Sequence, residues 1–287
     1  MVAYTHGTTG YGPACGGQSQ PDAKADIFIS RLIAMGYAVV APDYVGLGRF
    51  DTGVHPYLNI FSEAAATIDL LTAARSTEPT LSDSWAVLGG SQGGQAALAT
   101  AHLHSEYGPE SDFRGTVSID PESDVEAIMG MLGPYIPPAP PLVEGAYNFL
   151  ISVLAALRAA NPAVNVNSYL SRYGRHIVDQ VGKSCHGPNL PAGTALGSLL
   201  SKPLGTPAMR AALDRYMRVP TSDYDRPILL ALNTTDYVVP SPLHAKLVAD
   251  FSANRVDHRV VTGVGEHGHV NAQQQSAIER FLRAQLG

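Results

Sequence analysis

The stretch Trp85-Ala-Val-Leu-Gly-Gly-Ser-Gln-Gly-Gly-Gln95 decides the fold of this 287-residue chain. Its apolar first half, Trp85–Leu88, predicts a short buried strand, and the alanine-rich Gln95–His104 predicts a helix, so the chain must turn sharply between them. This turn contains Gly89-Gly-Ser-Gln-Gly93, which matches G-x-S-x-G, the nucleophile elbow. Glycines on both sides leave room for a strained turn that presents Ser91 as a nucleophile. The alternative is a glycine-rich turn that only packs a helix on a strand.

Composition places the chain among globular proteins. Hydrophobic residues make up 45% and charged residues 15% of the sequence, which suits a substantial core and argues against disorder. A net charge of -6 gives no basic footprint for nucleic acid and no polybasic patch for an anionic membrane. The longest apolar run, Tyr147–Leu157, is about half of the ~20 residues that a membrane span needs. We therefore expect a small or neutral partner, no nucleic acid and no integral membrane segment.

Strands and helices alternate four times over the first 120 residues. Met1–His6 and Tyr37–Ala41 are strand-like, the latter an apolar run typical of strands inside parallel sheets, and Gly115–Asp120 is the fourth strand-like segment. Crossovers of this length favour parallel pairing. We predict an α/β fold with an open, doubly wound, mostly parallel sheet, in which ligands bind beyond the carboxyl ends of the strands.

The pattern changes after Asp120. Residues 121–221 contain the helical apolar segments Leu142–Ala160 and Asn167–Val181, separated by Pro-rich and Gly-rich connectors, before a buried strand returns at Pro227–Leu232. We therefore predict an α/β core of residues 1–120 and 222–287, and a mostly helical cap of residues 121–221 inserted between two strands of the sheet.

A catalytic serine needs a base within hydrogen-bond reach and a third group that orients the base. Two of the ten histidines, His267 and His269, follow the last predicted strand and precede the last helix, where a base can approach the elbow. We assign His267, because Gly268 leaves space beside it, and keep His269 as the alternative. His6 is expected to orient the Gly-rich loop that follows the first strand-like segment, residues 7–17, which we call the first-strand loop. Six further histidines are interpreted as solvated surface or cap side chains: His102, His104, His176, His186, His244 and His258.

The orienting acid should precede the histidine in the chain. Asp236 fits this order, because it follows the strand Ile228–Leu232 and lies outside the next helix. A turn-stabilising aspartate is the structural alternative for this residue. Asp120, at the end of the preceding strand, is the rival acid.

A tetrahedral intermediate needs backbone N–H donors for its negative charge. Gln92, which opens the elbow helix, is predicted to supply the first donor, and Thr8 in the first-strand loop the second, with Thr9 as fallback. We expect no metal and no cofactor. His267-x-His269 lacks further identifiable zinc ligands, and the glycines of His6–Gly12 lack dinucleotide spacing and the Walker lysine. The only cysteines, Cys15 and Cys185, could close a large loop as a disulfide or be two unrelated buried thiols.

Six motifs occur together: His6-Gly-Thr-Thr-Gly10, Asp43-Tyr-Val-Gly-Leu-Gly48, His55-Pro-Tyr-Leu58, Gly89–Gly93, Asp236-x-x-x-Pro240 and Glu266-His267. With these motifs the chain resembles the α/β-hydrolase superfamily, and more narrowly its secretory lipase (Candida lipase A-like) family of carboxylesterases. The resemblance implies Ser91 as nucleophile, Asp236 as acid and His267 as base, with an oxyanion hole from the Thr8 region and Gln92. It also implies that Cys15 pairs with Cys185.

We therefore predict a serine carboxylic-ester hydrolase, an esterase or lipase, that works through an acyl-enzyme. The apolar helix Leu142–Leu157 is expected to line or cover the acyl site and to favour esters with apolar acyl groups. A serine acyltransferase or peptidase on the same fold is one alternative, and a catalytically silent binding module is another. Members of this family are commonly secreted, so we expect a secreted or extracytoplasmic protein. The first residues carry no signal peptide, which leaves a cytoplasmic location open. Because the chain starts at the strand before the oxyanion loop, we also expect the superfamily's first two strands to be missing: the chain is either a minimal or truncated version, or its true start lies upstream.

Overall fold

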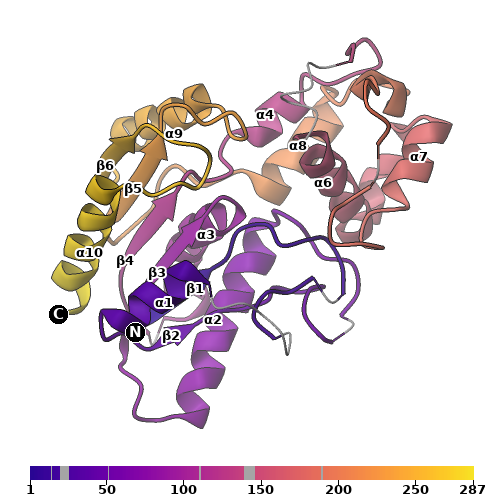
Figure 1. The fold of residues 1–287 in the computed structure, drawn as a ribbon. Coiled ribbons are helices and arrows are strands. Elements are labelled where there is room, and N and C mark those ends of the chain that lie inside the picture. Colours follow the sequence, from indigo (N-terminus) through magenta and orange to yellow (C-terminus); the bar gives the residue numbers. More distant parts are fainter. Residues whose placement is uncertain (14, 20–25, 51, 110, 139–145, 189) are drawn as a thin grey trace.

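The structure is a computed structural model and describes residues 1–13, 15–19, 26–50, 52–109, 111–138, 146–188 and 190–287. The strands of these residues form one sheet in the order β2-β1-β3-β4-β5-β6, and each neighbouring pair is parallel (Figure 1). They are β1 (Val2–Thr5), β2 (Val39–Val40), β3 (Ser84–Gly90), β4 (Asp112–Ile119), β5 (Ile228–Asn233) and β6 (His258–Gly263). The predicted open, parallel α/β sheet is therefore confirmed.

Helices cover both faces of the sheet (Figure 1). The helices of the core are α1 (Ile27–Ala34), α2 (Ile60–Thr77), α3 (Gln92–Tyr107), α9 (Ser241–Ala253) and α10 (Ala272–Leu286). Successive side chains of a strand point to opposite faces, so Leu88 of β3 packs in the cluster of α1 and α10, whereas Val87 packs against α2 and α3. Phe251 of α9 packs with Leu98 of α3 and with residues of β5, so α9 covers the same face of the sheet as α3. This two-sided covering is the doubly wound arrangement that the alternating pattern predicts.

One predicted strand is much shorter in the structure. The strand-like Tyr37–Ala41 forms only the two-residue β2, whose residues are half-buried. Among the described residues β2 pairs only with β1 and lies at the edge of the sheet. The run is apolar because both of its faces are covered although the strand lies at the edge: Tyr37, Val39 and Ala41 pack on the cluster of α1 and α10, and Val40 packs on the cluster of α2 and α3.

The described residues between β4 and β5 contain several helices, which lie together at one side of the sheet (Figure 1). We call these elements the inserted helices: α4 (Val125–Met129), α6 (Ala146–Ala160), η1 (Pro162–Val164), η2 (Val166–Ser168), α7 (Arg172–Val178), η3 (Leu196–Leu199) and α8 (Pro207–Met217). Of the predicted helix Leu142–Ala160, residues 142–145 lie outside the described residues. The predicted helix Asn167–Val181 is a short 3-10 turn followed by α7. We propose that the inserted helices form the cap of residues 121–221.

The inserted helices have a hydrophobic core that also takes in residues of the N-terminal half. Ile151 and Leu157 of α6 belong to the same buried cluster as Tyr11 and Tyr57, which lie in loops of the α/β core. No single helix of the described residues is long and apolar enough to cross a membrane. Within the described part of the chain, only α6 together with residues Pro162–Ser168 has the length and apolar composition of a membrane-crossing segment, and the two parts of this pair are bent by 107° relative to each other.

A disulfide joins the loop after β1 to the segment after α7. Cys15 and Cys185 are bonded, and their Cα atoms lie 5.3 Å apart. Gly10 packs directly against this bridge, because a Cβ on Gly10 would come within 2.9 Å of Cys185 Cβ. The first-strand loop is therefore tied covalently to the inserted helices.

We expect the Cys15→Ser substitution to lower the free energy of unfolding by about 2–4 kcal/mol, because the bridge restricts the unfolded chain. Urea denaturation without reductant measures this loss. Cys185→Ser should give the same loss, and the double variant should lose no more than either single variant. Unchanged midpoints in both single variants would contradict the bridge as a source of stability.

Candidate active site

Ser91 lies in the turn between β3 and α3 with φ of 57° and ψ of -124°, a region that residues other than glycine rarely adopt. Its N–H donates to the carbonyl oxygen of Ile119 in β4 at 2.9 Å. A Cβ on Gly93 would overlap the Thr5 carbonyl oxygen, and a Cβ on Gly89 would overlap the Gly93 carbonyl oxygen. The glycines are therefore needed for the close contact of β1 and α3 that surrounds the serine.

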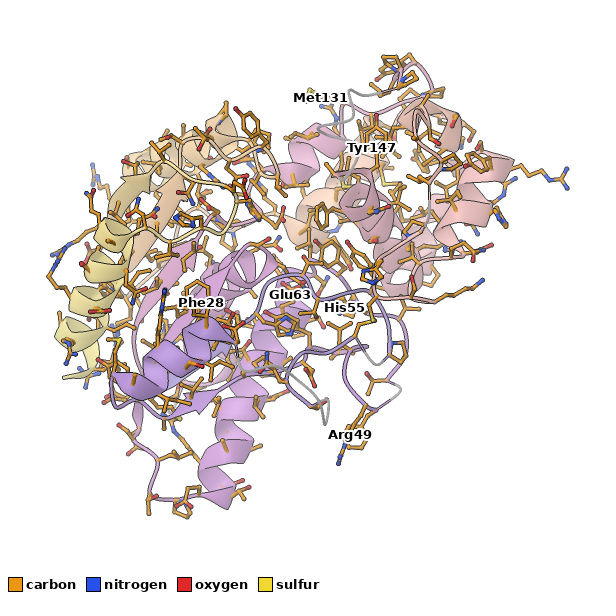
Figure 2. All side chains as sticks on the ribbon, viewed as in Figure 1. Phe28, Arg49, His55, Glu63, Met131 and Tyr147 are labelled. Atoms are coloured by element: carbon orange, nitrogen blue, oxygen red, sulfur yellow. A yellow bond between two sulfur atoms is a disulfide. The ribbon has the colours of Figure 1, made fainter. Side chains whose placement is uncertain are left out.

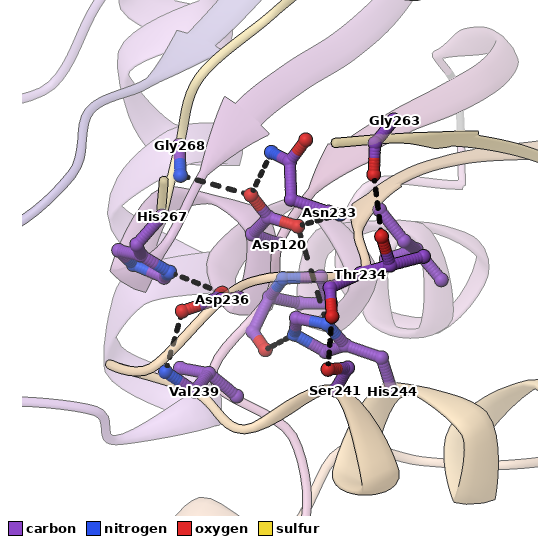
Figure 3. Close-up of polar contacts among 12 residues, drawn as sticks. Asp120, Asn233, Thr234, Asp236, Val239, Ser241, His244, Gly263, His267 and Gly268 are labelled. Atoms are coloured by element: carbon purple, nitrogen blue, oxygen red, sulfur yellow. Dashed lines mark hydrogen bonds and ion pairs between the residues drawn. The ribbon is translucent and has the colours of Figure 1, made fainter. Parts of the chain in front are cut away.

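Ser91, His267 and Asp236 form a continuous chain of contacts. His267 Nε2 lies 2.7 Å from Ser91 Oγ, and His267 Nδ1 lies 2.6 Å from Asp236 Oδ2. The carboxylate is buried, and its Oδ1 accepts the N–H groups of Val238 and Val239 at 2.8 and 3.0 Å (Figure 3). The structure thus brings together the three residues that the sequence suggests as nucleophile, base and acid.

The alternative base and acid lie close by but outside this chain of contacts. His269 offers its carbonyl oxygen to Asn233 Nδ2 at 2.8 Å. Asp120 is fully buried; its Oδ1 accepts the Asn233 N–H at 2.7 Å, and its Oδ2 accepts Asn233 Nδ2 at 2.7 Å and the Gly268 N–H at 2.8 Å (Figure 3). Asp120 therefore fastens the end of β4 to β5 and to the loop that carries His267.

The charges around His267 hold its pKa above the ordinary value. Burial lowers this pKa, but the hydrogen bond with Asp236 and the negative charges of Glu122, Asp236 and Asp120 raise it, and the net change is upward. The imidazolium form is thus stabilised where a general base would receive a proton.

Two histidines that we interpreted as solvated are buried, so that interpretation is wrong for them. His104 Nε2 lies 2.8 Å from Asp225 Oδ1. His244 is 2% exposed and its Nε2 lies 3.3 Å from the Pro121 carbonyl oxygen. Both lie on helices that pack closely against neighbouring elements, which sequence position does not reveal.

His244, Asp120 and Asp236 offer three ligand atoms within 4.8 Å of one another. Both carboxylates already accept N–H groups: Asp120 accepts three, and Asp236 accepts two from the backbone besides its contact with His267. Hydrogen bonds therefore account for both buried charges, and we propose no metal at this cluster.

The first-strand loop passes beside the nucleophile. A Cβ on Gly7 would lie 3.7 Å from Ser91 Cβ, and the next residue, Thr8, places its Oγ1 2.9 Å from the Tyr57 hydroxyl. Thr8 is half-buried, whereas the fallback Thr9 is exposed. Gln92 is the first residue of α3, and the first N–H groups of a helix have no partner within it. The structure thus brings both predicted donor segments to Ser91.

A buried network holds the Gln92 side chain, and sequence reasoning missed it. Gln92 Nε2 donates to His55 Nε2 at 3.0 Å and to Glu63 Oε1 at 2.7 Å. His55 Nδ1 lies 2.7 Å from the Val45 carbonyl oxygen and therefore carries the ring hydrogen. Burial lowers the pKa of His55 to about 4 and raises the pKa of Glu63 to about 8, so both are mainly neutral at pH 7. The two side chains lie near each other in Figure 2.

A further acid, Glu122, contacts the nucleophile directly. Its Oε1 lies 3.3 Å from Ser91 Oγ, and the residue is 5% exposed. Burial raises the pKa of Glu122 to about 7, against the opposing effects of the His267 charge and the Ser91 hydrogen bond. The signal for this residue is its position two residues after Asp120, at the carboxyl end of a strand, where ligands bind in such sheets.

One segment of the chain, which contains the elbow, is similar in sequence to a known family. Residues 20–134 match the family model for secretory lipases. The matched segment includes Ser91 and Glu122, and Asp236 and His267 lie beyond it. No curated protein matches the chain in sequence.

Solved structures of related shape include a lipase and an esterase. Candida antarctica lipase A has a TM-score of 0.76 and 16% identity over 99% of this chain and 70% of its own length. The rice cell wall degrading esterase LipA from Xanthomonas oryzae has a TM-score of 0.71 and 23% identity over 98% of this chain and 78% of its own. The chain has the α/β-hydrolase fold, which confirms the prediction. With the secretory lipase match, the fold supports carboxylic-ester hydrolase activity.

Asp120→Asn should lower the free energy of unfolding by about 1–3 kcal/mol, because an amide nitrogen cannot accept the N–H groups that the carboxylate oxygens accept. Urea denaturation checks this value. The control is Asp250→Asn, which removes a carboxylate that is paired with Lys246 on the helix surface and should cost less than about 1 kcal/mol. Equal small losses in the two variants would rule out the fastening role of Asp120.

Proposed function

We propose that the chain is a serine carboxylic-ester hydrolase that works through an acyl-enzyme, with Ser91 as nucleophile, His267 as general base and Asp236 as the orienting acid. The observation that carries this proposal is the unbroken contact from Ser91 Oγ through the imidazole of His267 to Asp236. The elbow conformation of Ser91 and the secretory lipase match support the same class of enzyme.

In the acylation step, Ser91 Oγ attacks the ester carbonyl carbon while His267 Nε2 accepts the hydroxyl proton. His267 Nδ1–H donates to Asp236, which fixes the tautomer and stabilises the imidazolium. The imidazolium then donates its proton to the leaving alcohol oxygen as the carbon–oxygen bond breaks. A water molecule, deprotonated by His267, releases the acyl group as a carboxylic acid and restores Ser91.

The backbone N–H groups of Thr8 and Gln92 are proposed to stabilise the oxyanion. The buried contacts of the Gln92 side chain with His55 and Glu63 support this role, because they hold the residue that carries one donor. The raised pKa of Glu63 also matters, since a neutral carboxyl does not oppose negative charge that develops nearby.

Apolar acyl groups fit the surroundings of the site. Tyr57, whose hydroxyl contacts Thr8, belongs to the same hydrophobic cluster as α6. We propose a small-molecule or lipid ester as substrate.

An extracytoplasmic location also fits the chain. The secretory lipase match points to secretion, and the Cys15–Cys185 disulfide is of the kind that persists in oxidising compartments. We therefore propose that the protein acts outside the cytoplasm.

Ser91→Ala should abolish hydrolysis of p-nitrophenyl esters, because no oxygen remains at the position that attacks the carbonyl. Release of p-nitrophenol over a series of acyl chain lengths measures this loss and the acyl preference of the parent protein. A fluorophosphonate probe should label the parent protein and leave Ser91→Ala unlabelled. Full activity in Ser91→Ala would overturn the proposal, and products transferred to added alcohols would identify an acyltransferase instead.

Asp236→Asn should lower kcat by a factor of roughly 10³ to 10⁴, because the amide stabilises the wrong tautomer of the base. The matched control is Asp225→Asn, which alters a second Asp–His pair. Asp225 Oδ1 lies 2.8 Å from Nε2 of His104, which is near the C-terminal end of α3. Steady-state kinetics should show the loss only for Asp236→Asn. A comparable loss in both variants would instead point to a general effect on folding.

A further inference from the structure

Ser91 Oγ has two polar side chains within reach, and the proposed mechanism uses only one of them. His267 Nε2 lies at 2.7 Å and Glu122 Oε1 at 3.3 Å. The hydroxyl carries a single hydrogen, so it can donate to one of these groups at a time. Which group receives that hydrogen depends on whether Glu122 is a carboxylate or a carboxylic acid.

Glu122 sits in an enclosed group of ionisable side chains. Negative or neutral groups face it from several elements: Asp236 on the loop after β5, Glu63 on α2, and Tyr11 and Tyr57 in the N-terminal loops. His267, on the loop after β6, is the positive partner whose charge acts on Glu122. The charge states of Glu122 and His267 are therefore linked through space and through Ser91.

We propose that Glu122 is a further catalytic residue, which shares one proton with His267 through the Ser91 hydroxyl and so sets the pH at which the base becomes free. This inference rests on the proposed function of Ser91 and His267. Its geometric basis is the direct contact of a buried carboxyl with the attacking oxygen.

The shared proton has two positions. When Glu122 holds it, the carboxyl O–H donates to Ser91 Oγ, and the hydroxyl of Ser91 donates to a neutral His267, which is ready to act as base. When the proton moves, Ser91 Oγ receives it from Glu122 and passes its own hydrogen to His267 Nε2. This leaves a carboxylate that accepts the hydrogen bond from Ser91 and an imidazolium that cannot act as base. The numbers of protons and charges balance in this transfer, and the pair titrates as a unit.

Glu122→Gln tests this role, because the amide keeps a hydrogen-bond donor beside Ser91 and removes the charge that stabilises the imidazolium. The acidic limb of kcat/KM should move to lower pH by about one unit, since a nearby opposite charge raises a histidine pKa by roughly that much or more. The measurement is the pH dependence of p-nitrophenyl ester hydrolysis by the full chain.

Glu126→Gln is the matched control. Glu126 is another buried glutamate with a raised pKa, of about 6, and it lies on α4 near Arg218, outside the contacts of Ser91 and His267. Its pH profile should superimpose on that of the parent protein. Glu122→Asp keeps a carboxylate and should leave the acidic limb closer to the parent position than Glu122→Gln does.

A readout on the resting enzyme separates this inference from the proposed function. NMR titration of the His267 ring should give a pKa about one unit lower in Glu122→Gln than in the parent protein, with no shift in Glu126→Gln. If the ring pKa shifts but the parent protein hydrolyses no ester, the hydrolase proposal fails and the linkage stands. If folded Glu122→Gln leaves both the ring pKa and the pH profile unchanged from Glu126→Gln, the role of Glu122 is refuted.

Discussion

The close approach of β1 to the first turn of α3 is the constraint on which the site depends. A Cβ at residue 93 would overlap the Thr5 carbonyl oxygen, so this position of the turn has no room for a side chain. The parallel register sets Thr5 beside Gly89, and Gly90 beside Ile119. The ends of β1, β3 and β4 therefore meet around Ser91. The first-strand loop and the acidic residues after β4 reach the serine because their strands end there.

The buried acids near His267 differ in how many donors reach them. Asp120 accepts three N–H groups, and Asp236 accepts two besides its contact with the imidazole. Glu122 and Glu63 receive fewer donors, and burial raises the pKa of each. One enclosed site thus combines fixed negative charge that orients the base with carboxyl groups that can be neutral near pH 7.

The sequence predicts the position of a residue well where that residue directly follows a predicted strand. Ser91, Asp236 and His267 each lie just beyond a parallel strand, so the topology alone brings them to one edge. The roles of His55 and Glu63 depend instead on side-chain contacts with Gln92, which no periodic pattern encodes. The burial of His104 and His244 was missed for a related reason: α3 packs against the sheet, α2 and α9, so a helix position remote from the elbow is still enclosed.

The insertion begins directly after β4, and this position brings the Glu122 carboxyl into contact with the Ser91 hydroxyl. The chain leaves the sheet at Asp120, which Asn233 fastens to β5, and Glu122 faces Ser91 only two residues later. The inserted helices begin at Val125, after this fixed segment. The disulfide at Cys15 holds a second point of the insertion to the first-strand loop. Because Asp120 and Asn233 hold the start of the insertion beside the nucleophile, Glu122 keeps its contact with Ser91 before the inserted helices begin.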